Sequence, residues 1–426
     1  MNISEHFPRY YDFNPLVPVW CITPETDGCL HRFFDTSPVS PSGRYVALLQ
    51  LPQELRLPEP GEAANIVLVD LHTAEERIVA QTYGWEPQLG ANINWGADDD
   101  SIFYNDVDTT TWEALCVRLN PHTGEKRNMP GSIYRISPDG KTIISACAKR
   151  MRRTQQGYGV VVPDEHVSRN YGFREDDGLY ALDTETGESK LLVSIKDVFD
   201  RAMPGIDKSL YEHGECYGFH CKFNPQGDRI LFTMRWFHTE QEQPWNMIQG
   251  GLKYWVVTMN SDGSDIRVAV GPEQWEKGGH HINWYPDGQR LSMNLCLDGD
   301  KQLYLVQVNA DGTNIGKIID SIPGSGHPTV HPNGRHIVTD SYGHEKVAFG
   351  DGTVPLRFID LQEKSESTIV RINIANPGTK VSGVLRVDPH PAWAPDNKHL
   401  VFNGYVGGTR RVFIADLSGL QSLGGQ

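Results

Sequence analysis

Four histidines share one position in a phrase that recurs along this sequence. Each stands five residues before the proline of the phrase, and they are His220, His281, His327 and His390. A lone interior histidine is usually a satisfied core side chain, but four at equivalent positions gain nothing from packing together. Imidazole is a common neutral metal ligand, and Asp388 could add a carboxylate. The pattern predicts a divalent metal, with Mn or Zn favoured over Ca, which prefers oxygen ligands.

A second set of candidate residues lies in or beside the long segments that join the repeats. We expect these side chains on the same face as the histidines: Tyr158, His166, Arg174, His213, Tyr217 and Arg235. Long loops on a rigid scaffold often carry function. The RMRR run (Arg150, Arg152 and Arg153) is interpreted as a solvated loop. Arginines beside a metal would nonetheless favour an anionic ligand, because a guanidinium can hold a carboxylate through two hydrogen bonds.

The repeated phrase itself predicts the elements that position these side chains. An aromatic or apolar residue is followed by x-Pro-(Asp/Asn/Ser)-Gly and then by an apolar run. The proline marks six copies, at Pro41, Pro138, Pro225, Pro286, Pro332 and Pro395, and Ala97 stands at this position in a seventh, degenerate copy. Each copy indicates strand, tight turn and strand, and further apolar runs supply two more strands. Seven four-stranded copies predict an all-β, seven-bladed β-propeller, and a tandem of β-sandwiches is the alternative.

The two ends of the chain are expected to close this ring. The last copy stops after its third strand, at VFIADLSGL, which leaves a strand edge that must be paired. The apolar residues 16–22 (LVPVWCI) are the obvious donor of the missing strand. We therefore expect residues 1–426 to form a single propeller domain. The histidines begin the innermost strands, so they should converge at one end of the central channel.

Composition excludes several classes of function. The 39 Lys and Arg against 54 Asp and Glu give a net charge of −15, which argues against nucleic-acid binding. No apolar run approaches the ~18 residues of a spanning helix, so we expect no membrane partner. The N-terminus, MNISEHFPRYY, does not resemble a secretory signal, and the seven cysteines are scattered. These features predict a reduced, cytoplasmic protein.

The histidines before repeated PDG turns, with DPHP in the last repeat, resemble oligogalacturonate lyase. The resemblance implies a cytoplasmic seven-bladed propeller lyase with a divalent metal held by histidines. The third repeat is also similar to ulvan lyases and rhamnosyl-glucuronate lyases, in which a Gly-Tyr-Gly phrase carries a catalytic tyrosine and an arginine follows sixteen positions later. Here QGYGV supplies Tyr158, and Arg174 stands sixteen residues on. The resemblance thus implies catalytic roles for Tyr158 and Arg174, with Arg235 on the same face.

The sequence departs from these families in two places. The second repeat has no histidine, and Asn92 and Asn105 stand there as candidate substrate-binding residues, together with His213 and Tyr217 of the third connecting loop. Asp388 replaces a second histidine of the oligogalacturonate lyase pattern. The uronate, the neighbouring sugar and the acid–base pair therefore stay open.

The implied reaction is β-elimination on a uronate-containing oligosaccharide, an anionic partner. The C5 proton becomes removable only when the adjacent carboxylate is neutralised, and a metal and arginines supply that charge. Tyr158 is the expected base or acid, and His281 or His220 is the rival base. The alternative is a non-catalytic propeller that binds a protein or glycan. A peptidase propeller cap is excluded because the sequence has no GxSxG elbow.

Overall fold

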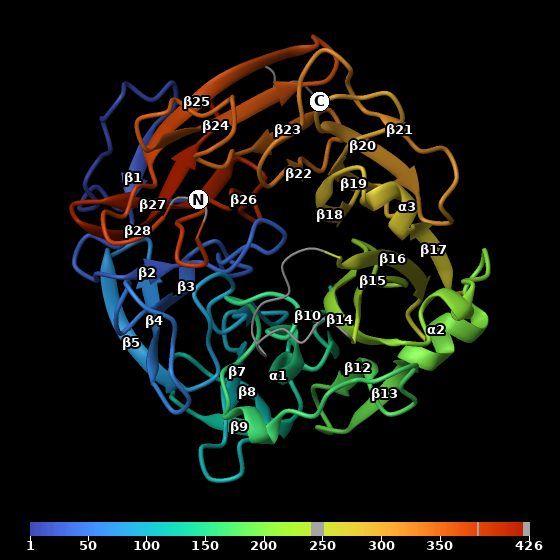
Figure 1. Cartoon of the computed structure of the whole chain (residues 1–426). Coiled ribbons are helices and arrows are strands. Elements are labelled where there is room, and N and C mark those ends of the chain that lie inside the picture. The colour runs from blue at the N-terminus through green and yellow to red at the C-terminus, as the bar shows by residue number, and fades with distance from the viewer. Residues whose placement is uncertain (240–250, 381–382, 421–426) are drawn as a thin grey trace.

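The computed structural model describes residues 1–239, 251–380 and 383–420, which form seven four-stranded antiparallel sheets. Figure 1 looks along the axis around which the sheets are arranged as blades. The innermost strand of each blade faces this axis, and the last strand of most blades lies at the rim. The predicted all-β, seven-bladed propeller is confirmed.

The first three blades follow one another along the chain, each built from four consecutive strands. Blade one contains β2 (Cys29–Leu30), β3 (Tyr45–Gln50), β4 (Ala64–Asp70) and β5 (Glu75–Thr82). Blade two contains β6 (Asn94–Trp95), β7 (Ile102–Val107), β8 (Ala114–Leu119) and β9 (Lys126–Pro130). Blade three contains β10 (Arg135–Ile136), β11 (Thr142–Ser145), β12 (Gly178–Asp183) and β13 (Ser189–Ser194).

The next three blades repeat this order. Blade four contains β14 (Gly214–Phe223), β15 (Arg229–His238), β16 (Lys253–Asn260) and β17 (Arg267–Val270). Blade five contains β18 (Gly279–Trp284), β19 (Arg290–Leu295), β20 (Tyr304–Asn309) and β21 (Gly316–Lys317). Blade six contains β22 (Thr329–Val330), β23 (His336–Thr339), β24 (Thr353–Asp360) and β25 (Ser365–Asn373). Short helices lie in the connections: α1 (Ala148–Met151), α2 (Ile195–Arg201), α3 (Pro272–Trp275) and the 3-10 turns Asp164–His166 and Lys208–Leu210.

The repeated phrase forms the turn between the first two strands of each blade, as predicted. In blade five the Asp287 carboxylate accepts hydrogen bonds from the backbone N–H of Gln289 (2.9 Å) and Arg290 (3.0 Å). Gly288 has φ +68°, a left-handed conformation that glycine adopts without strain. Proline before this pair presets the turn, so a local sequence signal fixes where the chain reverses.

The hydrophobic core lies between neighbouring blades. Leu231 and Val256 of blade four pack in one cluster with Ile282, Leu291 and Val306 of blade five, and all five side chains are buried. Each sheet therefore covers an apolar face of the next, and the ring is stable only if the last blade also meets the first. Within the described part of the chain, no helix is long and apolar enough to span a membrane.

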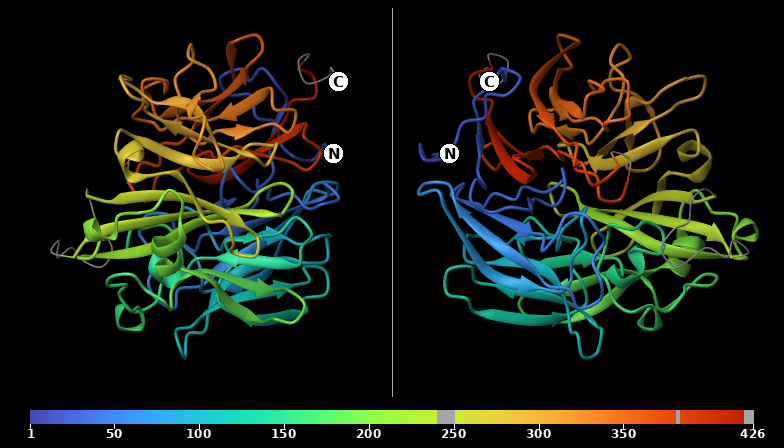
Figure 2. Two further views of the ribbon diagram at one scale, coloured as in Figure 1. Left: turned by 90° about the vertical axis from the view of Figure 1, so that its right-hand side faces the viewer. Right: turned by 60° about the vertical axis from the view of Figure 1, so that its left-hand side comes forward.

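The ends of the chain close the ring in blade seven. This blade contains β26 (Ala392–Trp393), β27 (His399–Val406), β28 (Thr409–Asp416) and, as its outer strand, β1 (Val19–Cys21). Val19 pairs with Ala415 and Cys21 with Phe413. Both views of Figure 2 show the blue N-terminal segment beside the red strands of this blade. The prediction that residues 16–22 complete the last blade is confirmed.

Replacing Val19 with aspartate is expected to lower the free energy of unfolding by about 3 kcal/mol, because the side chain is fully buried and a carboxylate there would have no counter-charge. Leu16→Asp is the matched control, since Leu16 lies three residues earlier and is 66% exposed. Thermal denaturation of both variants measures the difference. Equal melting temperatures for the two variants would contradict a stabilising role for the closing strand.

Candidate functional site

The four histidines lie in, or just before, the innermost strands of blades four to seven. His220 and His281 lie in β14 and β18, where the pairing register with the next strand shifts across Gly218–Cys221 and His280–Asn283. His327 and His390 each stand two residues before the first strand of their blade. His281 and His390 adopt positive φ (+60° and +49°). Bulges and left-handed residues redirect side chains, so all four rings can turn toward the channel.

Three side chains form a group that could hold a metal ion: His327, Asp388 and His390. One ligand atom of each lies within 4.8 Å of the others, and all three residues are buried. His327 Nε2 and both ring nitrogens of His390 are buried and have no hydrogen-bond partner among the described residues. Burial lowers the pKa of His390 well below its usual range, so this imidazole is neutral. Two imidazoles and a carboxylate suit Mn²⁺ or Zn²⁺.

The other two histidines are placed differently. The His281 ring lies 3.8 Å from that of His327, but its Nδ1 is 2.5 Å from the Gly326 carbonyl oxygen and its Nε2 is 3.1 Å from the Tyr342 hydroxyl. The His220 ring stacks on Phe219, with centroids 4.3 Å apart. His281 is therefore adjacent to the candidate metal group, whereas His220 is held in an aromatic stack.

Phe33, in the connection between the first two strands of blade one, lies among the four imidazoles. Its ring centroid is 5.5 Å from His220, 6.0 Å from His281, 5.6 Å from His327 and 4.7 Å from His390. The sequence analysis missed this residue, because it stands outside the repeated position and only its pairing with Phe34 marks it. An apolar ring at the centre of the channel explains why the four histidines do not meet at one point.

A cavity of about 180 Å³ opens beside the histidines. Its lining includes four of the predicted site residues, namely Tyr158, His220, Arg235 and His281, together with aromatic side chains of Phe219, Tyr254, Trp275 and Tyr342. These residues come from blades three to six, so the cavity is formed between blades. The tertiary structure thus brings one predicted tyrosine, one predicted arginine and two predicted histidines to a single small cavity.

Arg235 faces this cavity from within β15. Its guanidinium carbon lies 3.4 Å from the centroid of the Phe219 ring, and its Nη1 donates to Gln155 Oε1 (2.7 Å). The aromatic contact holds the side chain without neutralising it, and arginine stays protonated in proteins. Arg235 therefore presents a positive charge that an anionic group can meet.

Arg386, which sequence analysis did not select, connects the metal group to Tyr158. Its Nε lies 2.8 Å from Asp388 Oδ2, and its guanidinium is near enough to the Tyr158 phenol to oppose the rise in the pKa of Tyr158 that burial causes. The guanidinium carbon is also 5.4 Å from the Tyr342 ring centroid. The sequence feature that could have pointed to Arg386 is its place two residues before Asp388, in the phrase LRVDPHP.

Tyr158 is held in place by the glycines on either side. Gly157 and Gly159 have φ of +91° and +96°, and a Cβ at Gly159 would lie 2.2 Å from the Ala148 carbonyl oxygen. Burial raises the pKa of Tyr158, against the opposing effect of Arg386 and Arg235, so the phenol keeps its proton at neutral pH. The Gly-Tyr-Gly phrase therefore sets a close backbone approach that fixes a protonated phenol at the cavity.

The remaining predicted residues do not line this cavity. Arg174 pairs with Asp176 at the surface, and His213 is exposed. The buried Tyr217 hydroxyl donates to Glu215. Asn92 is buried, and the Asn105 amide exchanges hydrogen bonds with the Ile133 backbone. Their assignments to catalysis or to substrate binding stay predictions.

The RMRR run is not a solvated loop. Arg150 lies 2.9 Å from Asp177, Arg152 lies 2.5 Å from Glu86 and Arg153 lies 3.5 Å from Glu215. All three carboxylates are buried, because the loop folds back onto blades two to four. These pairs anchor the segment that carries Tyr158. The positive charge beside the cavity comes instead from Arg235 and Arg386.

Two solved structures match this chain over nearly its whole length. One is an oligogalacturonate lyase in complex with manganese, with a TM-score of 0.63 and 17% identity over 98% of this chain and 99% of that chain. The other is an oligogalacturonate lyase from Vibrio parahaemolyticus, with a TM-score of 0.63 and 16% identity over 97% of both chains. This chain shares the fold of these two structures. No family model and no curated protein matches the sequence.

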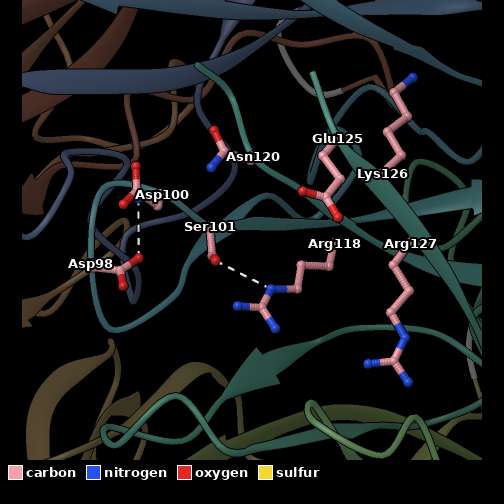
Figure 3. A pocket seen from close by; sticks show the side chains of 8 residues that line it. All are labelled: Asp98, Asp100, Ser101, Arg118, Asn120, Glu125, Lys126 and Arg127. Carbon is pink, nitrogen blue, oxygen red and sulfur yellow. Dashed lines mark hydrogen bonds between the residues drawn. The ribbon is translucent and has the colours of Figure 1, made fainter. Parts of the chain in front are cut away.

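A second cavity lies on blade two (Figure 3). Charged side chains surround its volume of about 360 Å³. Arg118 Nε donates to Ser101 Oγ (3.2 Å), and Arg127 donates to the carbonyl oxygens of Glu185 (2.6 Å) and Thr186 (2.7 Å). The Arg127 contacts tie blade two to blade three, so the charged residues here also join neighbouring blades.

Proposed function

We propose that this protein is a metal-dependent lyase that cleaves a uronate-containing oligosaccharide by β-elimination. One observation carries the proposal: Tyr158 and Arg235 face one cavity, and Arg386 joins Tyr158 to the group formed by His327, Asp388 and His390. A protonated phenol, a free positive charge and a set of metal donors are the parts that this reaction needs. The shared fold with oligogalacturonate lyases supports the same reaction class.

The substrate carboxylate is assigned to Arg235, whose guanidinium contacts Gln155, Phe219 and Tyr254 and has no carboxylate partner among the described residues. Neutralising that carboxylate makes the C5 proton more acidic, because the negative charge that develops next to it is stabilised. A divalent cation held by His327, Asp388 and His390 would add charge stabilisation as a Lewis acid. We favour Mn²⁺ or Zn²⁺ for this site, and the matched oligogalacturonate lyase structure is a manganese complex.

Proton transfer is assigned to Tyr158 and a histidine. In β-elimination the C5–H and C4–O bonds break, a C4=C5 double bond forms, and the leaving oxygen takes a proton. Because Tyr158 keeps its proton, its hydroxyl is suited to protonate the leaving oxygen. His220 Nε2 is suited to accept the C5 proton, since it has no hydrogen-bond partner in the described chain and burial keeps the ring neutral. His281 is a weaker candidate base because both of its nitrogens are engaged.

The partner and compartment follow from the same proposal. The substrate is an anionic oligosaccharide, and the protein acts in the cytoplasm. All seven cysteines are free thiols in the structure, which is consistent with a reducing compartment.

The proposal is tested with a panel of galacturonate, glucuronate and iduronate oligosaccharides, each incubated with the protein and Mn²⁺ or Zn²⁺. We expect ultraviolet absorbance from a 4,5-unsaturated uronate with at least one substrate, and its loss when the metal is removed by a chelator. Binding of an oligosaccharide without any absorbance would favour the non-catalytic propeller instead.

A further inference from the structure

The Asp340 carboxylate lies between the two histidines of the candidate metal group. Asp340 follows β23 in blade six and is fully buried. Its Oδ1 accepts hydrogen bonds from the His327 backbone N–H (2.7 Å) and from His327 Nδ1 (2.9 Å). Its Oδ2 lies 3.0 Å from the same Nδ1 and accepts from the His390 backbone N–H at 2.9 Å. One carboxylate therefore holds residues from blade six and blade seven.

These contacts determine which nitrogen of His327 can bind a cation. Both Asp340 oxygens act as acceptors, since each receives a hydrogen bond from a backbone N–H, so His327 Nδ1 is the donor in the contact with this carboxylate. The lone pair of a neutral His327 is then on Nε2, the nitrogen that is buried without a partner among the described residues. A hydrogen bond to the far nitrogen fixes both the tautomer and the ring orientation of a metal-binding histidine.

The same carboxylate also sets the position of His390. This residue has φ +49°, a conformation that a non-glycine residue rarely adopts without support. The hydrogen bond from its N–H to Asp340 Oδ2 supplies that support and places the ring next to His327, with centroids 4.2 Å apart. Without Asp340, neither the tautomer of His327 nor the backbone of His390 would be specified.

The backbone at Gly326 lies very close to Asp340. A Cβ on Gly326 would lie 2.2 Å from the Asp340 carbonyl oxygen and 2.2 Å from its Oδ1. Only glycine allows the backbone before His327 to approach Asp340 in this way. A glycine immediately before His327 therefore allows His327 to reach the Asp340 side chain.

We propose that Asp340 is a positioning residue for a divalent-cation site formed by His327, Asp388 and His390. The inference rests on the metal of the proposed function. It assigns a role to Asp340, which is not one of the three candidate metal ligands. Asp340 acts through His327 and His390, by directing Nε2 of one and the backbone of the other. Its removal should weaken the site even though all three donor side chains remain.

Metal titration by calorimetry, with Mn²⁺ alone and no substrate, tests the inference. Asp340→Asn is expected to bind Mn²⁺ ~10–100-fold more weakly than the wild-type protein, the range typical for partners behind metal ligands. Asp360→Asn is the matched control, because Asp360 is also a buried carboxylate of blade six, lies 3.4 Å from His336, and has no part in the candidate group. This control should bind Mn²⁺ as the wild-type protein does.

The outcomes separate this inference from the proposed function. A folded Asp340→Asn variant with wild-type affinity for Mn²⁺ overturns the role of Asp340 while leaving the metal site intact. A wild-type protein that binds neither Mn²⁺ nor Zn²⁺ overturns the metal of the proposed function, and the role of Asp340 with it.

A second measurement needs no variant, and so covers the case in which Asp340→Asn fails to fold. Nitrogen-15 NMR of the histidine-labelled, metal-free protein should show His327 protonated at Nδ1. A His327 ring protonated at Nε2 would overturn the inference, because that nitrogen could not then present a lone pair.

Discussion

Tyr158→Phe is expected to lower the rate of uronate elimination by ~10²–10⁴-fold, the usual effect of losing a positioned proton-transfer group. The substitution removes only the hydroxyl of a residue that lines the cavity and is influenced by the nearby charge of Arg386. The ring still fills its buried position, so fold and metal content should not change. The measurement is the initial rate of ultraviolet absorbance increase on the best substrate of the panel.

Tyr405→Phe is the control for this prediction. Its hydroxyl donates to the Gly408 carbonyl oxygen in an outer turn of blade seven, so the same chemical change there should leave the rate nearly unaltered. Near-full activity of Tyr158→Phe together with an inactive His220→Ala or His281→Ala would assign proton transfer to a histidine. Full activity of all three variants would remove the support for a lyase and favour the binding module.

His327→Ala is expected to abolish stoichiometric metal binding and, with it, most of the activity. The substitution removes one of the two imidazoles in the candidate group and leaves Asp340 facing an empty space. A Lewis-acidic cation contributes several kcal/mol to stabilising transition-state charge. That free energy corresponds to a rate loss of roughly 10³-fold. Elemental analysis of the purified protein and the elimination assay measure the two effects.

His331→Ala is the control. His331 lies in the same blade as His327 but at the other end of the inner strand β22, where its ring contacts the Asn397 carbonyl oxygen. Its metal content and rate should match those of the wild-type protein. Treating the wild-type protein with a chelator should reproduce the His327→Ala rate, and adding Mn²⁺ should restore activity only to the wild-type protein. Unchanged metal content in His327→Ala would contradict the assignment of this residue.

The number of blades and their closure could be predicted because the signals that determine them are local. A Pro-Asp-Gly turn forms from its own four residues, as at Gly288, and the apolar runs beside it have the period of a strand. Counting such turns gives the number of blades. The last strand, which ends at residue 416, would have an unpaired edge unless another segment paired with it. The apolar segment at residues 16–22 was the available donor.

The position of the histidines within the repeat was also readable: two lie in inner strands and two lie just before them. What the sequence could not show is which of these rings share a ligand. Phe33 enters the channel from blade one, and it separates His220 from His390. No repeat rule predicts Phe33, because it stands outside the shared position.

Contacts between distant segments decided the rest of the candidate site. Arg386 meets Tyr158 across more than two hundred residues of sequence, and Asp340 meets the His390 backbone fifty residues away. Arg174, whose spacing from Tyr158 was the sequence signal, pairs instead with its neighbour Asp176. The sequence by itself determined the strands, the turns and their order, since short-range geometry fixes them. Only the tertiary structure decided which side chains meet at the axis, because each blade contributes its own residues there and their loops pack against one another.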